Sequence, residues 1–141
     1  MTAYVDTSAL VKLLVPEIGT DDVGGLWDRV GDRYASLIGY TELRAAVASA
    51  SRARRLDGLA HLASRALIEE LWSSIVAVDV DEALVRAAGE LSDRHGLRSS
   101  DAIHLASAIR IAEGPTAFIA FDARLRGAAA AEGLIVLPDL A

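Results

Sequence analysis

Short, apolar, strand-forming segments alternate with helical segments along the whole chain. They predict strands at residues 3–5 (AYV), 33–36 (RYAS), 75–80 (IVAVDV), 117–121 (AFIAF) and 134–137 (LIVL). The segments between them predict helices at residues 8–15, 21–30, 41–54, 57–73, 81–95, 99–113 and 123–132. Strands separated by helices are typical of βαβ units, in which successive strands run parallel. We therefore expect an α/β fold with a central, mostly parallel five-stranded sheet that is flanked by helices.

The length and composition predict a single domain over residues 1–141. The chain has 141 residues, 52% of them hydrophobic, which is enough for one buried core. It contains no cysteine, so disulfides and thiolate metal sites are excluded and a metal would need oxygen or imidazole ligands. No uncharged segment is long enough to span a membrane, and no basic signal region precedes the first apolar segment. We expect a cytoplasmic protein with no membrane partner.

Among the 20 acidic residues, four are candidates for a shared site because of their positions relative to the predicted strands and helices. Asp6 follows the first strand, and Glu42 opens the helix after the second strand. Asp101 opens the most apolar helix, and Asp122 follows the AFIAF strand. The carboxyl ends of parallel strands share one edge of the sheet, where ligands bind. Each acid alone is readily explained as a helix cap or a first-turn acid, but together they are expected to converge.

Converging carboxylates favour a hard divalent cation. Carboxylates within a few ångströms of one another repel, so a cluster must take up protons or bind a cation. Ligands that are all oxygen atoms in an open cleft suit Mg²⁺ or Mn²⁺, which retain water and bridge to phosphate oxygens. The chemistry that this pattern favours is phosphodiester hydrolysis, with the metal activating water.

Five segments carry a resemblance to a known family: YVDTSALVKLLVPE (4–17), YTELRAA (40–46), LRSSDAIHLASA (97–108), FIAFDARLRGAA (118–129) and GLIVLPD (133–139). In this order and spacing the chain resembles the PIN-domain ribonucleases, and specifically the VapC-type toxins of toxin–antitoxin modules. The resemblance implies a PIN-like three-layer fold and a Mg²⁺- or Mn²⁺-dependent endoribonuclease that acts on RNA. It also implies a homodimer that a cognate VapB-like antitoxin neutralises.

The resemblance assigns roles to individual residues. Asp6, Glu42, Asp101 and Asp122 correspond to the catalytic acidic site. Asp6 and Asp101 would be the direct metal ligands, and the other two acids would complete the shell through the metal, its waters or a second ion. Ser8 corresponds to a hydroxyl that hydrogen-bonds the site in similar sequences, although an N-cap of the first helix explains it equally well.

One departure from the family pattern leaves alternatives open. Similar sequences commonly carry threonine two residues before the fourth acid, whereas this chain has Ala120 there. The missing hydroxyl keeps open a catalytically impaired PIN-like module that acts through protein partners. A Mg²⁺-dependent phosphatase or phosphoacceptor domain would also place aspartates at a sheet edge, but resemblance to those families calls for a lysine late in the chain. Lys12 is the only lysine.

Basic residues are concentrated in one part of an acidic chain. The net charge of −6 excludes a uniformly basic surface for nucleic acid, yet residues 42–65 hold five arginines against two acidic residues. Those arginines either form a solvated helix end or contact RNA or an acidic partner; the candidates for such contact are Arg44, Arg52, Arg54 and Arg55. Near the proposed acids, Arg98 and Arg124 either reach a phosphate or pair with a neighbouring carboxylate.

His104 lies one turn after Asp101 in the same predicted helix. A lone histidine in an apolar helix is more often a hydrogen-bonded core residue than a catalytic base or a metal ligand. We therefore expect His104 to belong to the scaffold of the site.

Overall fold

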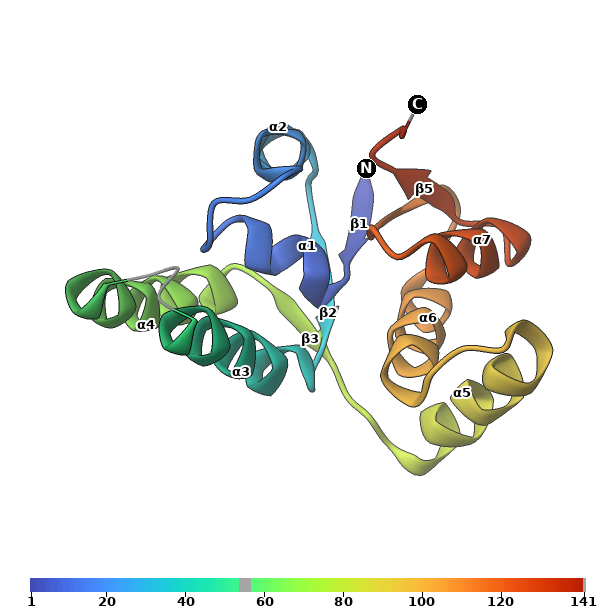
Figure 1. Ribbon diagram of the computed structural model, residues 1–141. Coiled ribbons are helices and arrows are strands. Elements are labelled where there is room, and N and C mark those ends of the chain that lie inside the picture. The colour runs from blue at the N-terminus through green and yellow to red at the C-terminus, as the bar shows by residue number, and fades with distance from the viewer. Residues whose placement is uncertain (54–56, 141) are drawn as a thin grey trace.

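Five parallel strands form one sheet in the computed structural model, which describes residues 1–53 and 57–140 (Figure 1). The strands are β1 (Thr2–Val5), β2 (Arg33–Ser36), β3 (Val76–Val78), β4 (Thr116–Ile119) and β5 (Ile135–Leu137). Their order is β3-β2-β1-β4-β5, and every neighbouring pair is parallel. The chain thus builds one half of the sheet outward from β1 and then returns to place β4 on the other side of β1. The predicted α/β fold with a central parallel sheet is confirmed.

Helices cover both faces of this sheet. They are α1 (Thr7–Lys12), α2 (Thr20–Arg29), α3 (Gly39–Arg52), α4 (Gly58–Ser73), α5 (Glu82–His95), α6 (Ser99–Ile111) and α7 (Ala123–Ala131). Each expected helix is present, with ends that differ from the prediction by up to three residues. Figure 1 shows α1 to α4 on one side of the sheet and α5 to α7 on the other, which makes three layers. None of these helices, within the described part of the chain, is long and apolar enough to cross a membrane.

Alternate residues of the two central strands pack against opposite helical layers. Tyr4 of β1 and Phe118 of β4 are fully buried in the core formed with α5, α6 and α7, where their rings stack at 5.6 Å. Ala3 and Ile119 point the other way, into the core formed with α1, α2 and α3. This two-residue period is the geometry of an extended strand. It explains why both strands are largely apolar after their first residue, since both faces are buried.

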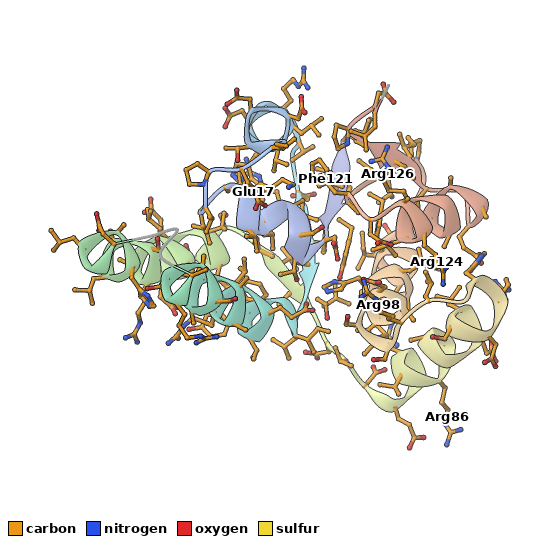
Figure 2. All side chains as sticks on the ribbon, in the orientation of Figure 1. Glu17, Arg86, Arg98, Phe121, Arg124 and Arg126 are labelled. Carbon is orange, nitrogen blue, oxygen red and sulfur yellow. The ribbon has the colours of Figure 1, made fainter. Side chains whose placement is uncertain are left out.

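Arg126 of α7 fastens the carboxyl edge of the sheet (Figure 2). Its guanidinium donates to the carbonyl of Ala120, just after β4, at 2.8 Å, and to the carbonyl of Pro138, just after β5, at 2.7 Å. The backbone that leads out of two neighbouring strands is therefore held by one side chain. This places the start of α7 firmly at the edge where the predicted acids gather.

Candidate active site

Asp6 joins the central strand to the first helix. Its Oδ2 accepts hydrogen bonds from the Ser8 backbone N–H at 3.3 Å and from the Ser8 hydroxyl at 2.5 Å, so Asp6 itself is the N-cap of α1. The side chain is almost fully buried, with the residue 5% exposed. Ser8 is therefore not the N-cap of α1. Its hydroxyl instead donates a hydrogen bond to Asp6, an acid of the candidate site.

Glu42 lies in the first turn of α3 and faces the start of α1. Its Oε1 accepts a hydrogen bond from the Thr7 hydroxyl at 2.8 Å and lies 2.6 Å from Nε2 of His104. Burial alone would raise the pKa of Glu42. The hydrogen bond and charge of His104, together with the Thr7 hydroxyl, outweigh burial and hold the pKa below its ordinary value. Glu42 is therefore a carboxylate at neutral pH.

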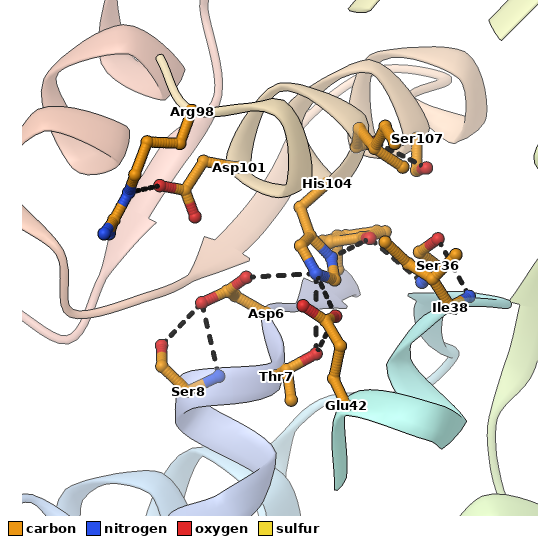
Figure 3. Close-up of polar contacts among 12 residues, drawn as sticks. Asp6, Thr7, Ser8, Ser36, Ile38, Glu42, Arg98, Asp101, His104 and Ser107 are labelled. Atoms are coloured by element: carbon orange, nitrogen blue, oxygen red, sulfur yellow. Dashed lines mark hydrogen bonds and ion pairs between the residues drawn. The ribbon is translucent and has the colours of Figure 1, made fainter. Parts of the chain in front are cut away.

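His104 projects from α6 between two acids (Figure 3). The residue is 1% exposed, its Nδ1 lies 2.7 Å from the Tyr4 hydroxyl, and its Nε2 lies 3.7 Å from Oδ1 of Asp6. Burial lowers the pKa of His104, but the hydrogen bond to Glu42 and the nearby carboxylate charges raise it above its usual value. The expectation of a buried, hydrogen-bonded histidine is correct. That its partners include acids of the candidate site was not foreseen.

Asp101 reaches the same edge of the sheet by a different route from the other acids. It does not follow a strand, because α6 follows α5 and runs back toward the start of β4. The N-cap of α6 is Arg98, which makes no side-chain capping bond. Asp101 lies in the first turn and is not the N-cap residue. Burial raises the pKa of Asp101, and the charges of Asp6 and Asp122 raise it further, against the opposing effects of Arg98 and His104.

Asp101 and Asp122 line one open pocket of about 670 Å³. Asp122 is the N-cap of α7, where its Oδ2 accepts from the Leu125 N–H at 3.0 Å, and the residue is exposed. The remaining lining residues are Gly96, Arg98, Ala123 and Arg124. Asp6 acts on the Asp101 pKa electrostatically from the buried side. The four predicted acids thus form two linked groups, one around His104 and one around the pocket.

The two predicted arginines of this region line the pocket (Figure 2). Nε of Arg98 lies 3.6 Å from Oδ2 of Asp101, but its side chain is 83% exposed. Nη1 of Arg124 donates to the Gly96 carbonyl at 3.0 Å. Both guanidinium groups therefore lie beside the acids while staying open to solvent.

The other basic residues lie along α3, away from the pocket. Nη1 of Arg44 donates to the Tyr40 hydroxyl at 3.0 Å, and Arg52 is exposed at the end of the helix. With a rise of 1.5 Å per residue, Arg52 lies about 15 Å along the helix from Glu42. Arg54 and Arg55 lie outside the described residues. Arg44 also lines a second pocket, of about 330 Å³, between α3 and α4.

Two polar residues of the site were missed by sequence reasoning. Thr7 bonds Glu42, and Tyr4 bonds His104. The signal for Tyr4 was present, since it lies two residues before Asp6 in a strand and therefore faces the same side. Ala120, the departure from the family pattern, is fully buried in the apolar core with α5 to α7 and adds no polar group to the site.

Fold and site together define the class: an α/β protein with an acidic pocket at the carboxyl edge of a parallel sheet, beside the point where the strand order reverses. The family model described as PIN domain matches residues 3–131. Ribonuclease VapC45 of Mycobacterium tuberculosis is 35% identical over 135 residues, which cover 96% of this chain and 94% of that protein. The chain therefore belongs to the PIN-domain family, in the branch that contains the VapC ribonucleases.

Solved structures show the same fold. FitAcB from Neisseria gonorrhoeae superposes with a TM-score of 0.70 at 20% identity, covering 97% of each chain. VapC20 of Mycobacterium tuberculosis, described as a toxin that cleaves the sarcin-ricin loop, gives a TM-score of 0.69 at 21% identity, over 95% of this chain and 97% of that one. A toxin–antitoxin complex from Klebsiella pneumoniae gives 0.57 at 19% identity, over 84% and 85%. The fold expected from the resemblance is thus confirmed.

Proposed function

We propose that this protein is a divalent-metal-dependent endoribonuclease, the toxin of a type II toxin–antitoxin pair, which hydrolyses RNA phosphodiester bonds at its acidic pocket. The observation that carries the proposal is the open pocket lined by Asp101 and Asp122, where the charges of Asp6 and Asp122 add to burial in raising the pKa of Asp101. Two acids from distant parts of the chain thus act on Asp101, which lines an open pocket. The curated relatives are named ribonucleases, which supports RNA as the substrate.

The donor chemistry of the pocket fits Mg²⁺ or Mn²⁺. All the acidic donors are oxygen atoms, and the one guanidinium paired with Asp101 is largely in solvent, which leaves the carboxylate repulsion only weakly compensated. Asp6 and Asp101 are our candidates for direct ligands, with Glu42 and Asp122 completing the site. A bound ion would activate water for attack and offset the charge on the scissile phosphate.

The acids of the described residues do not by themselves form a site that surrounds a metal ion. Among residues 1–53 and 57–140, no group of three or more acidic or histidine side chains is arranged to hold a metal ion. Mg²⁺ tolerates this, because it usually binds one or two protein carboxylates and keeps several waters beside substrate phosphates. We infer that RNA phosphate oxygens and water supply the rest of the coordination.

Arginines supply the proposed contacts with RNA and with a partner protein. Arg98 and Arg124 lie at the pocket wall, where a guanidinium can bind a phosphate through two hydrogen bonds. Arg44 and Arg52, together with Arg54 and Arg55, which lie outside the described residues, would contact either RNA further from the cleaved bond or an acidic antitoxin segment. We propose a VapB-like antitoxin, a homodimer and a cytoplasmic location, with support from the similarity to VapC20 and to a toxin–antitoxin complex.

The alternative functions find no favouring observation. The only lysine, Lys12, pairs with Glu17 at 3.1 Å and lies over the Phe121 ring at 4.5 Å, and it does not line the acidic pocket. A phosphatase or phosphoacceptor chemistry that depends on a lysine is therefore not supported. The hypothesis of a catalytically impaired module depends on Ala120 alone, and the cleavage experiment described next tests it.

That experiment compares cleavage of total cellular RNA by the wild-type protein with Mg²⁺, with chelator, and by Asp6→Asn and Asp101→Asn. We expect the chelator and each substitution to reduce cleavage by about 100-fold or more, because each removes the cation or a proposed ligand. Arg86→Gln, far from the pocket on α5, is the matched control and should cleave like the wild type (Figure 2). Equal cleavage by the wild type and both aspartate variants would overturn the proposal.

A further inference from the structure

A buried chain of hydrogen bonds leads from the sheet to Glu42. The Ser36 backbone N–H donates to the Tyr4 hydroxyl oxygen at 2.9 Å, and that oxygen lies 2.7 Å from Nδ1 of His104. Nε2 of His104 lies 2.6 Å from Oε1 of Glu42. Ser36, Tyr4 and His104 are each at most 1% exposed. Water therefore does not compete for these bonds, and they fix their members firmly.

This chain sets which nitrogen of the neutral ring carries the proton. Nε2 of His104 lies 2.6 Å from Oε1 of Glu42, and a carboxylate oxygen can only accept, so the ring proton of the neutral form lies on Nε2. Nδ1 of the neutral ring is then an acceptor, and the Tyr4 hydroxyl, 2.7 Å away, donates to it. The imidazolium form also carries a proton on Nε2. The bond to Glu42 is therefore present in both forms of the ring.

The two oxygens of Glu42 have different surroundings. Oε1 accepts from the Thr7 hydroxyl at 2.8 Å and from Nε2 of His104. Within the described part of the chain, no hydrogen bond or ion pair reaches Oε2. One oxygen is thus held by two protein donors, and the other stays available to a cation, to water or to substrate.

We propose that His104 is a positioning residue: through Nε2 it fixes the orientation of Glu42 toward the acidic site, while the bond between Nδ1 and Tyr4 holds the ring in place. This inference rests on the proposed function, because Glu42 matters only if the acidic site acts. The residue touches neither substrate nor reacting atoms and works through the carboxylate alone. Partners that orient ligands of metal sites typically change affinity or activity by about 10- to 100-fold when they are replaced.

Two amide substitutions provide a matched pair. In His104→Gln the amide nitrogen lies near the place of Nε2 and can still donate to Glu42. In His104→Asn the amide lies near the place of Nδ1 and cannot. Both bury one amide, so their melting temperatures should be similar. We expect His104→Asn to lower kcat for RNA cleavage by about 10- to 100-fold with little change in KM, and His104→Gln to recover most of it.

Manganese affinity supplies a readout that does not depend on cleavage. Titration of the metal-free protein, followed by electron paramagnetic resonance, should show weaker Mn²⁺ binding in His104→Asn than in the wild type or His104→Gln. In a Glu42→Gln background, His104→Asn should cause no further loss, because His104 acts through Glu42. Additive losses in the double variant would overturn the inference, as would wild-type kcat and Mn²⁺ affinity in His104→Asn.

The ¹⁵N spectrum of the metal-free wild-type protein tests the tautomer without any substitution. Neutral His104 should show a protonated Nε2 and an unprotonated Nδ1, and the opposite assignment would overturn the inference even if the variants fail to fold. If the wild type cleaves no RNA, the proposed function fails while Mn²⁺ affinity and the ¹⁵N shifts still decide the role of His104. Cleavage by the wild type with equal loss in both amide variants would leave the function standing and overturn the positioning role.

Discussion

Asp6 and Asp122 are both helix caps and acids of the candidate active site. Each uses Oδ2 to accept a backbone N–H in the first turn of its helix. Oδ1 of Asp6 stays turned toward His104, at 3.7 Å. A capping aspartate is held in one rotamer near the positive end of a helix dipole, which also orients its second oxygen. The helix-cap explanation and the site explanation are therefore compatible for these residues.

Asp101 differs from these caps in its effect on stability, because its ionised form opposes folding in the absence of a cation. Its pKa is raised by burial and by neighbouring carboxylates, so the folded protein binds the proton more tightly than the unfolded chain. Stability falls as pH rises from the unfolded pKa through the folded pKa, and the loss is complete above both. We expect metal-free Asp101→Asn to melt a few degrees above the wild type at pH 7.

Thermal unfolding of the metal-free proteins at two pH values checks this expectation. The difference in melting temperature between Asp101→Asn and the wild type should shrink at a pH below the folded and unfolded pKa values of Asp101, where the wild-type carboxyl is protonated. Saturating Mn²⁺ should reduce or reverse this difference in melting temperature at pH 7, since only the wild type keeps all four acids of the candidate site. A metal-free Asp101→Asn that melts below the wild type at pH 7 would show that the ionised carboxylate stabilises the folded protein, contrary to this expectation.

At the scale of elements, the ends of helices α5 and α7 are joined by one acid. Glu132, the C-cap residue of α7, accepts from Nη1 of Arg94 at 2.5 Å and lies 2.8 Å from Nε2 of His95. Both partners lie in the last turn of α5. The hydrogen bond of His95 is the main cause that lowers the pKa of Glu132; burial opposes it, and the hydrogen bond and charge of Arg94 add to the lowering. This contact links two helices of the layer that carries Asp101.

Glu132→Gln should therefore destabilise the protein in a pH-dependent manner. Because the folded pKa of Glu132 is lowered, its contribution is present above the unfolded pKa and is lost as pH falls through the folded pKa. We expect a loss of about 1 kcal/mol in the free energy of unfolding at pH 7, measured by urea denaturation, and a smaller loss near pH 3, below the ordinary pKa of a glutamate. Glu82→Gln, which removes a largely exposed pair with Arg86, is the control and should change little at either pH.

At the scale of the whole molecule, charge is distributed unevenly. The chain carries a net charge of −6, yet α3 leads from Glu42, an acid of the candidate site, to Arg52 at its far end. An acidic protein that acts on a polyanion needs such a local basic surface, since steering of the substrate depends on local charge. The axis of α3 places Arg52 about 15 Å from Glu42, outside the acidic pocket.

Neutralising this surface should reduce the salt dependence of RNA binding. We expect Arg44→Gln and Arg52→Gln each to weaken binding of single-stranded RNA, and to flatten the slope of log K against log salt by about 0.7 for each phosphate that is no longer neutralised. Binding is measured with chelator present, so that no RNA is cleaved. Arg86→Gln, on α5 and away from α3, is the control (Figure 2). An unchanged slope would contradict contact with RNA and would favour the two other interpretations of these arginines, a solvated helix end or contact with a partner protein.

The sequence by itself determined the elements and the chemical nature of the site. Strand and helix order follows from local patterns: apolar segments such as AFIAF, and acids such as Asp122 that begin helices. The five-stranded parallel sheet could be predicted for this reason, and the four acids became candidates because of where they lie in this order of elements. The helix ends were less certain, because capping at the last turn depends on neighbours that lie outside the helix.

Only the tertiary structure decided how those residues meet. Tyr4, Glu42 and His104 lie far apart in the chain, and their contact depends on the order of the strands and on how α6 packs against them. The division of the acids into a buried group around His104 and an open pocket around Asp101 has the same origin. Local sequence records which groups a segment carries, whereas distances between segments arise from the burial of whole faces at once.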